Sequence, residues 1–160
     1  MSALSIAVSF LLGPLQVKAI YVHVLGGSMS VKAVEVFGLK WLNLTPHDIN
    51  VYTSDNKLYF TVPRSGLVAR LEEETEHVGQ FVGVPVVRKR YKGVSVNGRS
   101  IEDVIEEVKP DMVIVSVLCL PALPMKIGTA FIVAPDTGPD SAVRNEKGQI
   151  VGVKRFMVRA

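Results

Sequence analysis

Hydrophobic and polar residues alternate along most of the chain after residue 30, and many of the apolar residues are β-branched. This pattern is typical of β-strands that bury one face. It predicts strands at residues 31–37, 40–44, 49–53, 58–62, 66–72, 82–91 and 93–96. Turn-forming residues at 54–56 predict that the strands on either side of them pair as a hairpin. We interpret the acidic run at residues 72–76 as a solvated strand end or loop.

One α-helix is predicted over residues 101–108, directly after a tight-turn signal at Asn97-Gly98. Ser100 is a suitable N-cap with Asp103 at the capping-box position, and Pro110 ends the helix. Apolar residues recur on one helix face, at Ile101, Val104, Ile105 and Val108. We expect this face to pack against the sheet.

The apolar run at residues 112–120 has no polar face, which is typical of a strand covered on both sides at the centre of a sheet. We interpret Ser116 as a buried hydroxyl rather than a nucleophile, because no Gly-x-Ser-x-Gly turn surrounds it. Cys119 is interpreted as a small buried hydrophobic residue. Residues 141–144 and 149–158, on either side of a turn ending in Gly148, predict a second hairpin.

Residues 1–30 differ from the rest of the chain, with apolar segments at residues 3–12 and 17–25. Neither segment is long enough to span a bilayer, and no basic residue precedes the first one. Two hypotheses remain open. Translation begins at Met29 and residues 1–28 are an extension, or residues 1–30 form an extra strand or helix on the body. In both cases we expect one β-rich domain at residues 31–160.

Composition agrees with a single globular domain, since 48% of the 160 residues are hydrophobic and 21% are charged. The patterns together predict a mainly β (α+β) fold with one helix, either a small β-barrel or a strongly twisted antiparallel sheet. Abundant valine and scarce glutamine favour a thermophilic source. The lone cysteine excludes an internal disulfide and a thiolate zinc cluster, and the sequence features favour a cytoplasmic protein.

Several motifs between residues 42 and 156 resemble those of a family of small uncharacterised proteins from phages, prophages and prokaryotic genomes. They are Asn43-Leu44-Thr45-Pro46-His47, residues 64–70, 83–86 and 113–116, Ala134-Pro135-Asp136-Thr137-Gly138-Pro139, and residues 143–150. The chain departs from the family pattern at the helix of residues 97–109 and at residues 120–128. The resemblance implies a shared fold and a shared polar site, but no reaction.

His47 is the leading candidate for a functional side chain, because Pro46 fixes the backbone before it and polar residues surround it. Asn43, Thr45 and Asp48 are those neighbours. One interpretation is an imidazole that faces a ligand at a strand end. The other is a turn in which the Thr and Asp side chains bond local amides. The sequence leaves both open.

A second polar cluster comprises Asp136, Thr137, Asp140 and Arg144. Its two carboxylates could bind a cation or act as acid and base, although turn formation alone explains them better. Arg70 and Arg144 interrupt apolar strands, where a guanidinium needs an anionic partner. That partner is either internal, such as Asp136, or a bound phosphate or carboxylate. We expect His47 and Asp136 to lie on one face, with Arg70 or Arg144 beside them.

Metal and nucleic-acid binding are not favoured by the sequence. His23, His47 and His77 are scattered and lack zinc-site spacing, so we expect no metal and no cofactor. The basic run at residues 88–92 alternates between the two faces of a strand, so a charged edge strand explains it as well as a nucleic-acid site does.

Three functional classes follow from the candidate residues. The favoured one is a module that binds a small anionic molecule or nucleotide, as in a regulator encoded by a phage or its host. Its ligand-binding residues would be Asn43, Thr45, His47, Arg70, Asp136, Thr137 and Arg144. The alternatives are a hydrolase that uses His47 with Asp136, and a structural or assembly protein without pocket chemistry. No membrane partner is expected, and the oligomeric state stays open.

Overall fold

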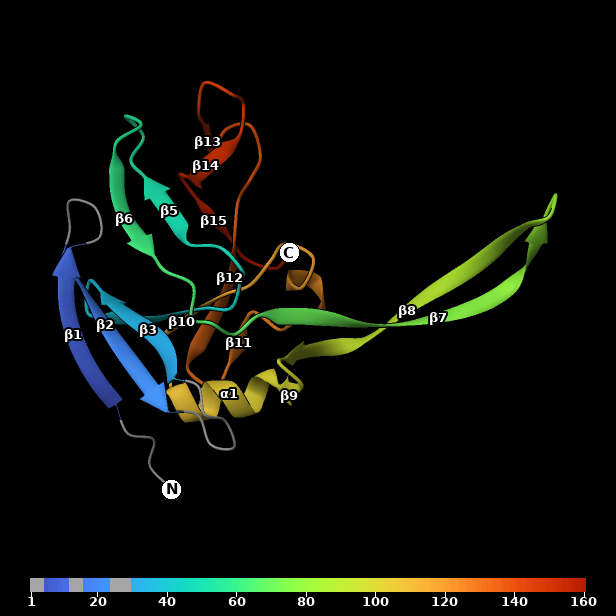
Figure 1. The fold of residues 1–160 in the computed structure, drawn as a ribbon, viewed down its shortest axis with the longest axis horizontal. Coiled ribbons are helices and arrows are strands. Elements are labelled where there is room, and N and C mark those ends of the chain that lie inside the picture. Colours follow the sequence, from blue (N-terminus) through green and yellow to red (C-terminus); the bar gives the residue numbers. More distant parts are fainter. Residues whose placement is uncertain (1–4, 12–15, 24–29) are drawn as a thin grey trace.

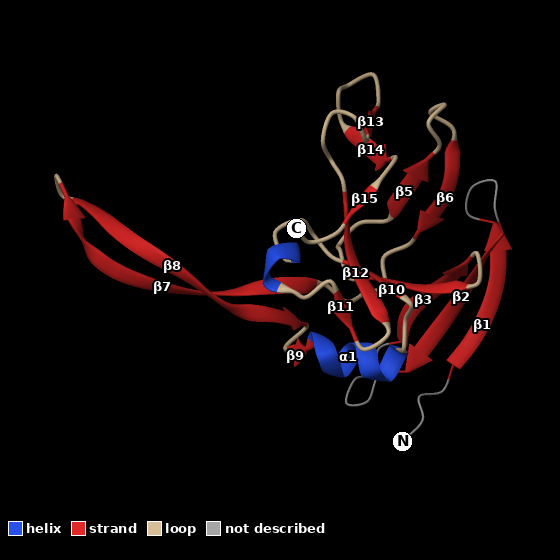
Figure 2. Ribbon diagram, turned by 180° about the vertical axis from the view of Figure 1, so that it is seen from behind, coloured by secondary structure: helices blue, strands red, loops and turns tan. Residues whose placement is uncertain are grey.

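The computed structural model describes residues 5–11, 16–23 and 30–160 of the chain. Met29, the alternative translation start, lies outside these residues. The described part is mostly β with one α-helix, as predicted, and its strands form three sheets (Figures 1 and 2). These sheets are not closed into a barrel. Among the described residues, no helix has the length and apolar character that crossing a membrane requires.

The main sheet mixes parallel and antiparallel strands, which corrects the expected antiparallel arrangement. Its order is β1 (Ser5–Leu11), β2 (Gln16–His23), β3 (Ser30–Val36), β4 (Leu39–Asn43), β10 (Met112–Ile114), β12 (Ala130–Pro135) and β11 (Lys126–Ile127), with β15 (Phe156–Met157) also on β12. The central strands β4, β10 and β12 run parallel to one another. Their carboxyl ends therefore meet at one edge of the sheet.

Two hydrophobic clusters cover the two faces of β10. Val113 packs in a cluster with the apolar stripe of helix α1 (Ile101–Val108), whereas Ile114 packs in the other cluster, with Trp41 and Phe60. The helix confirms the prediction, since the Ser100 side chain accepts a hydrogen bond from the Asp103 backbone amide. Coverage of the strand on both faces is also confirmed.

The expected central strand is nevertheless too long. β10 ends at Ile114, and Val117 and Leu118 are 41% and 77% exposed. The Cys119 amide bonds to the Ser116 carbonyl, so the chain turns there and enters a 3₁₀ helix, Leu120–Ala122. Apolar sequence alone did not distinguish a buried strand from this exposed turn.

The second sheet packs through β5 and β6 against the Ile114 face of the main sheet. Its order is β13 (Ala142–Arg144), β14 (Ile150–Val153), β5 (Ile49–Tyr52) and β6 (Leu58–Val62). Val51 of β5 and Phe60 of β6 belong to the same cluster as Ile114. Both predicted hairpins, β5–β6 and β13–β14, are confirmed.

The third sheet consists of β7 (Ala69–Phe81), β8 (Val84–Val96) and the short β9 (Arg99–Ser100). β7 and β8 extend from the rest of the molecule as a two-stranded projection, which we call the arm (Figures 1 and 2). The acidic run at residues 72–76 is exposed, as predicted, but it lies inside β7 and not at a strand end or in a loop. Its carboxylates face the basic run on β8, and this cross-strand pairing extends a strand that has no buried face.

Candidate functional site

A cavity of about 680 Å³ lies beyond the carboxyl ends of the three parallel strands. Residues that follow β4, β10 and β12 line it together with β14 and the start of β5. Most of its wall is apolar, from Pro46, Ile49, Val117, Pro135, Ile150, Val151 and Val153. Its polar groups belong to Thr45, His47, Asp48, Asn50, Arg64, Ser116 and Thr137. The carboxyl edge of parallel strands is a common place for ligands in proteins with open sheets.

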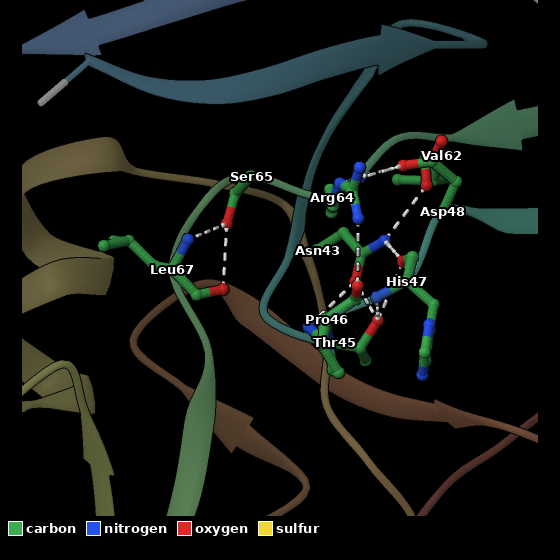
Figure 3. Close-up of polar contacts among 9 residues, drawn as sticks. All are labelled: Asn43, Thr45, Pro46, His47, Asp48, Val62, Arg64, Ser65 and Leu67. Atoms are coloured by element: carbon green, nitrogen blue, oxygen red, sulfur yellow. Dashed lines mark hydrogen bonds and ion pairs between the residues drawn. The ribbon is translucent and has the colours of Figure 1, made fainter.

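The buried Asn43 side chain shapes the loop that carries His47 (Figure 3). Its Nδ2 donates to the carbonyls of His47, at 2.8 Å, and Val62, at 3.0 Å. Its Oδ1 accepts from the Thr45 backbone amide at 2.9 Å and from the Thr45 hydroxyl at 2.7 Å. Asn43 therefore acts on the loop and does not line the cavity, while the buried Thr45 does both.

His47 and Arg64 bring exposed side chains to the cavity. In Figure 3 the imidazole of His47 extends away from the hydrogen-bond network that holds its backbone. The Arg64 backbone amide donates to Asp48 Oδ1 at 2.9 Å, whereas the Arg64 guanidinium lies 4.0 Å from the same oxygen. Its Nη1 also donates to the Pro46 carbonyl at 3.4 Å, so two long contacts hold the guanidinium at the rim.

The polar motif at residues 134–139 lies far from His47 in sequence, but it contributes Pro135 and Thr137 to the same cavity. Asp136, between them, is not part of the wall. Its Oδ1 accepts from the Gly138 amide at 2.9 Å, and its Oδ2 lies 2.8 Å from Arg155 Nη2. The Gly138 hydrogen bond and the Arg155 ion pair lower the pKa of the Asp136 carboxyl.

The two arginines expected at the site lie elsewhere. Arg70 lines a neighbouring cavity of about 360 Å³ that shares Thr45, Pro46 and Ser116 with the larger one. Arg144 donates to the Gly148 carbonyl at 2.6 Å, within its own hairpin turn. The partner of Asp136 is Arg155, because β15 and the residues before it lie along the end of β12.

Sequence reasoning missed Arg64, which is the arginine at the cavity. Arg64 lies at the cavity because β6, which ends at Val62, pairs with β5, which begins beside His47. Ser116 is half-buried and lines the cavity, which corrects the expected buried hydroxyl, and its hydroxyl donates to Cys119 Sγ at 3.4 Å. Cys119 is buried, as predicted. The described residues include no group of His, Cys, Asp and Glu side chains that could hold a metal ion.

Comparison with other proteins does not identify the site, since no protein-family model, curated protein or solved structure matches the chain. The resemblance to phage and prophage proteins stays a prediction.

The lowered pKa of Asp136 makes a prediction about acid stability. The carboxyl ionises more easily in the folded chain than at its ordinary value of 3.8, so it stabilises the fold above that pH. This stabilisation is lost as the pH falls through the folded-state pKa. Thermal melts from about pH 6 to about pH 2 should show a flatter acid slope for Asp136→Asn than for the wild type. Asp140→Asn removes an exposed carboxylate from the same segment and serves as the control for the change in net charge.

Proposed function

We propose that the protein is a small-molecule-binding module whose ligand is a small anion with an apolar part. The cavity of about 680 Å³ carries this proposal, because two motifs distant in sequence line it together. A mostly apolar wall with a few convergent polar groups is the usual composition of a small-molecule site. The resemblance to phage and prophage proteins favours a regulator, encoded by a phage or its host, as the biological role.

Charge at the rim supports an anionic ligand. The Arg64 side chain is exposed, and its guanidinium makes only two long contacts, with the Pro46 carbonyl at 3.4 Å and with Asp48 Oδ1 at 4.0 Å. It therefore keeps N–H donors that match a carboxylate or phosphate. The His47 imidazole adds a second nitrogen donor to the same cavity. His47 also has the only aromatic ring among the described residues of the wall, so a ligand without a stacked base fits better than a nucleotide.

The hydrolase alternative is less well supported. It requires Asp136 to act with His47, but both Asp136 oxygens already accept hydrogen bonds, from Gly138 and Arg155. A carboxylate with a lowered pKa is also a weak base. These contacts favour a role for Asp136 in holding the loop that carries Thr137.

The fluorescent probe 8-anilinonaphthalene-1-sulfonate tests the proposal, because it combines an anionic group with apolar rings. We expect saturable binding of this probe, weakened about tenfold or more by His47→Ala and by Arg64→Gln. Thermal stability should change by less than about 3 °C in both variants, because both side chains are exposed. Fluorescence titration and thermal melts provide the two measurements.

Arg144→Gln is the matched control, since this arginine is exposed but lies outside the cavity. It should bind the probe as the wild type does. Equal binding by all three variants would contradict the proposed site. Unfolding of His47→Ala would support the alternative interpretation of His47 as a turn residue.

A further inference from the structure

Within the part of the chain that the structure describes, nothing packs against the outer part of the arm. Every residue from 72 to 92 is exposed, over two strands of 13 residues each. At about 3.3 Å per residue such strands reach about 40 Å, and both views show them standing away from the body (Figures 1 and 2). Among the described strands, only β9 adds to an outer edge of the arm, at Ser95 and Val96 of β8.

Two properties of the arm indicate that it binds a partner. A two-stranded hairpin without a hydrophobic face is only marginally stable in water, and its unpaired edges invite another strand. The tip of the arm also exposes large apolar side chains. Phe81 is 74% exposed, Val82 is 87% exposed and Val84 is 63% exposed. Apolar residues gathered in this way are typical of an interaction surface.

We call residues 72–76 of β7 and 88–92 of β8 the stem of the arm. Charge is distributed unequally between these two strands. β7 carries the acidic residues Glu72, Glu73, Glu74 and Glu76. β8 carries the basic residues Arg88, Lys89, Arg90 and Lys92. Within the arm these charges pair across the strands, for example Lys89 with Glu73 at 2.8 Å and Arg90 with Glu76 at 3.1 Å. One outer edge of the arm is therefore acidic and the other is basic.

We propose that the arm binds a second copy of this chain, with the outer edge of β7 paired to the outer edge of β8 in the next copy. The arms lie side by side and point in the same direction. β7 runs outward and β8 runs back, so the new strand pair is antiparallel, as in the hairpin itself. The acidic run of β7 in one copy then faces the basic run of β8 in the next copy, and the apolar tips of the two arms lie next to each other.

The charges disfavour a two-fold pairing of the arms. A two-fold axis would pair β7 with β7 or β8 with β8, and so place acidic runs or basic runs against each other. The pairing of β7 in one copy with β8 in the next copy joins two different surfaces of the chain. Such a contact repeats from copy to copy and produces a closed ring or an open filament.

Nucleic acid and membranes fit the arm less well than a second copy does. The basic side chains of β8 already have carboxylate partners on β7, so few free cations remain for a phosphate backbone. The stem carries these charges on both of its faces, so only the apolar tip of the arm is suited to contact with lipid.

An exchange of charges between the two strands tests the proposal, because it keeps every ion pair within the arm. The exchanged variant carries Glu73→Lys, Glu74→Lys, Glu76→Lys, Arg88→Glu, Lys89→Glu, Arg90→Glu and Lys92→Glu. It should assemble with itself, because its edges still have opposite charges. It should not co-assemble with the wild type, because acidic edges would meet acidic edges and basic edges would meet basic edges.

Native mass spectrometry over a concentration series measures both properties, because the two chains differ in mass. We expect assemblies of the wild type alone and of the exchanged variant alone, and no mixed assemblies after the two are combined at low concentration and concentrated together. A second variant with only Glu73→Lys, Glu74→Lys and Glu76→Lys has basic residues on both strands and should lose assembly completely.

Three results would overturn the proposal. The wild type stays monomeric at every concentration, the exchanged variant mixes freely with the wild type, or the three-residue variant assembles as well as the wild type. A monomeric wild type that binds vesicles of phosphatidylcholine and phosphatidylglycerol, or duplex DNA, would assign the arm to that partner instead. Binding of the fluorescent probe at the cavity is independent of all these outcomes.

Discussion

Asn43→Ala is expected to lower the free energy of unfolding by about 3–5 kcal/mol, the largest effect of any single polar substitution at the site. The Asn43 side chain is fully buried and makes four hydrogen bonds. Alanine would leave the Val62 carbonyl and the Thr45 amide without this partner, whereas the His47 carbonyl would keep its hydrogen bond from the Thr45 hydroxyl. Each buried polar group left unpaired costs about 1–3 kcal/mol, and the small cavity adds to the cost.

Denaturant unfolding measures this loss, and Asn145→Ala is the matched control. Asn145 also makes several hydrogen bonds through its side chain, to Lys147 and Gln149, but it is exposed in the hairpin turn. Water replaces those bonds, so the control should cost about 1 kcal/mol or less. Similar losses in the two variants would contradict the role of Asn43 in holding the loop.

Local signals explain which elements the sequence predicted. The helix after Ser100 has a cap, a periodic apolar face and a terminating proline, all within a few residues of one another. The tight turn at Asn97-Gly98 is also local, and both residues adopt the positive φ, 49° and 82°, that this turn requires. Each of these features is determined by residues close together in the chain.

Long-range pairing explains what the sequence did not predict. The parallel contacts of β10 with β4 and β12 join segments about 70 and 20 residues apart, and no local pattern encodes them. The sequence predicted strands at residues 66–72 and 82–91 but not the continuous hairpin of β7 and β8, because residues 72–81 have no buried face and thus no apolar alternation. The acidic run in β7 was interpreted as a strand end or loop for this reason, although its partners lie on β8.

The candidate site was predictable in part. The polar motif around His47 follows the predicted strand of residues 40–44, and the motif around Thr137 follows the apolar residues 130–134, so both motifs were recognisable from the sequence. The contribution of Arg64, and the pairing of Asp136 with Arg155 rather than with Arg144, depend on how β6 and β15 pack. These contacts are tertiary, so no spacing within the sequence contains them.

Ile114→Ala is expected to lower the free energy of unfolding by about 2–5 kcal/mol. Ile114 is fully buried, and it packs with Trp41, Phe60 and Val133 between the main sheet and the second sheet. Parallel strands flank β10 on both sides, so the backbone around the missing side chain has little freedom to close the cavity. Denaturant unfolding followed by the fluorescence of the single tryptophan, Trp41, measures the loss.

Two further substitutions separate the short strand of the structure from the longer one that the sequence predicts. Ile114→Val removes one methylene and should cost about 0.5–1.5 kcal/mol. Val117→Ala should cost less than about 0.5 kcal/mol, because Val117 lies beyond the end of β10 and is exposed. A large loss at Val117 would restore the longer buried strand. A loss well below about 1 kcal/mol for Ile114→Ala would remove β10 from the centre of the core, because truncation of a fully buried isoleucine to alanine costs about 2–5 kcal/mol.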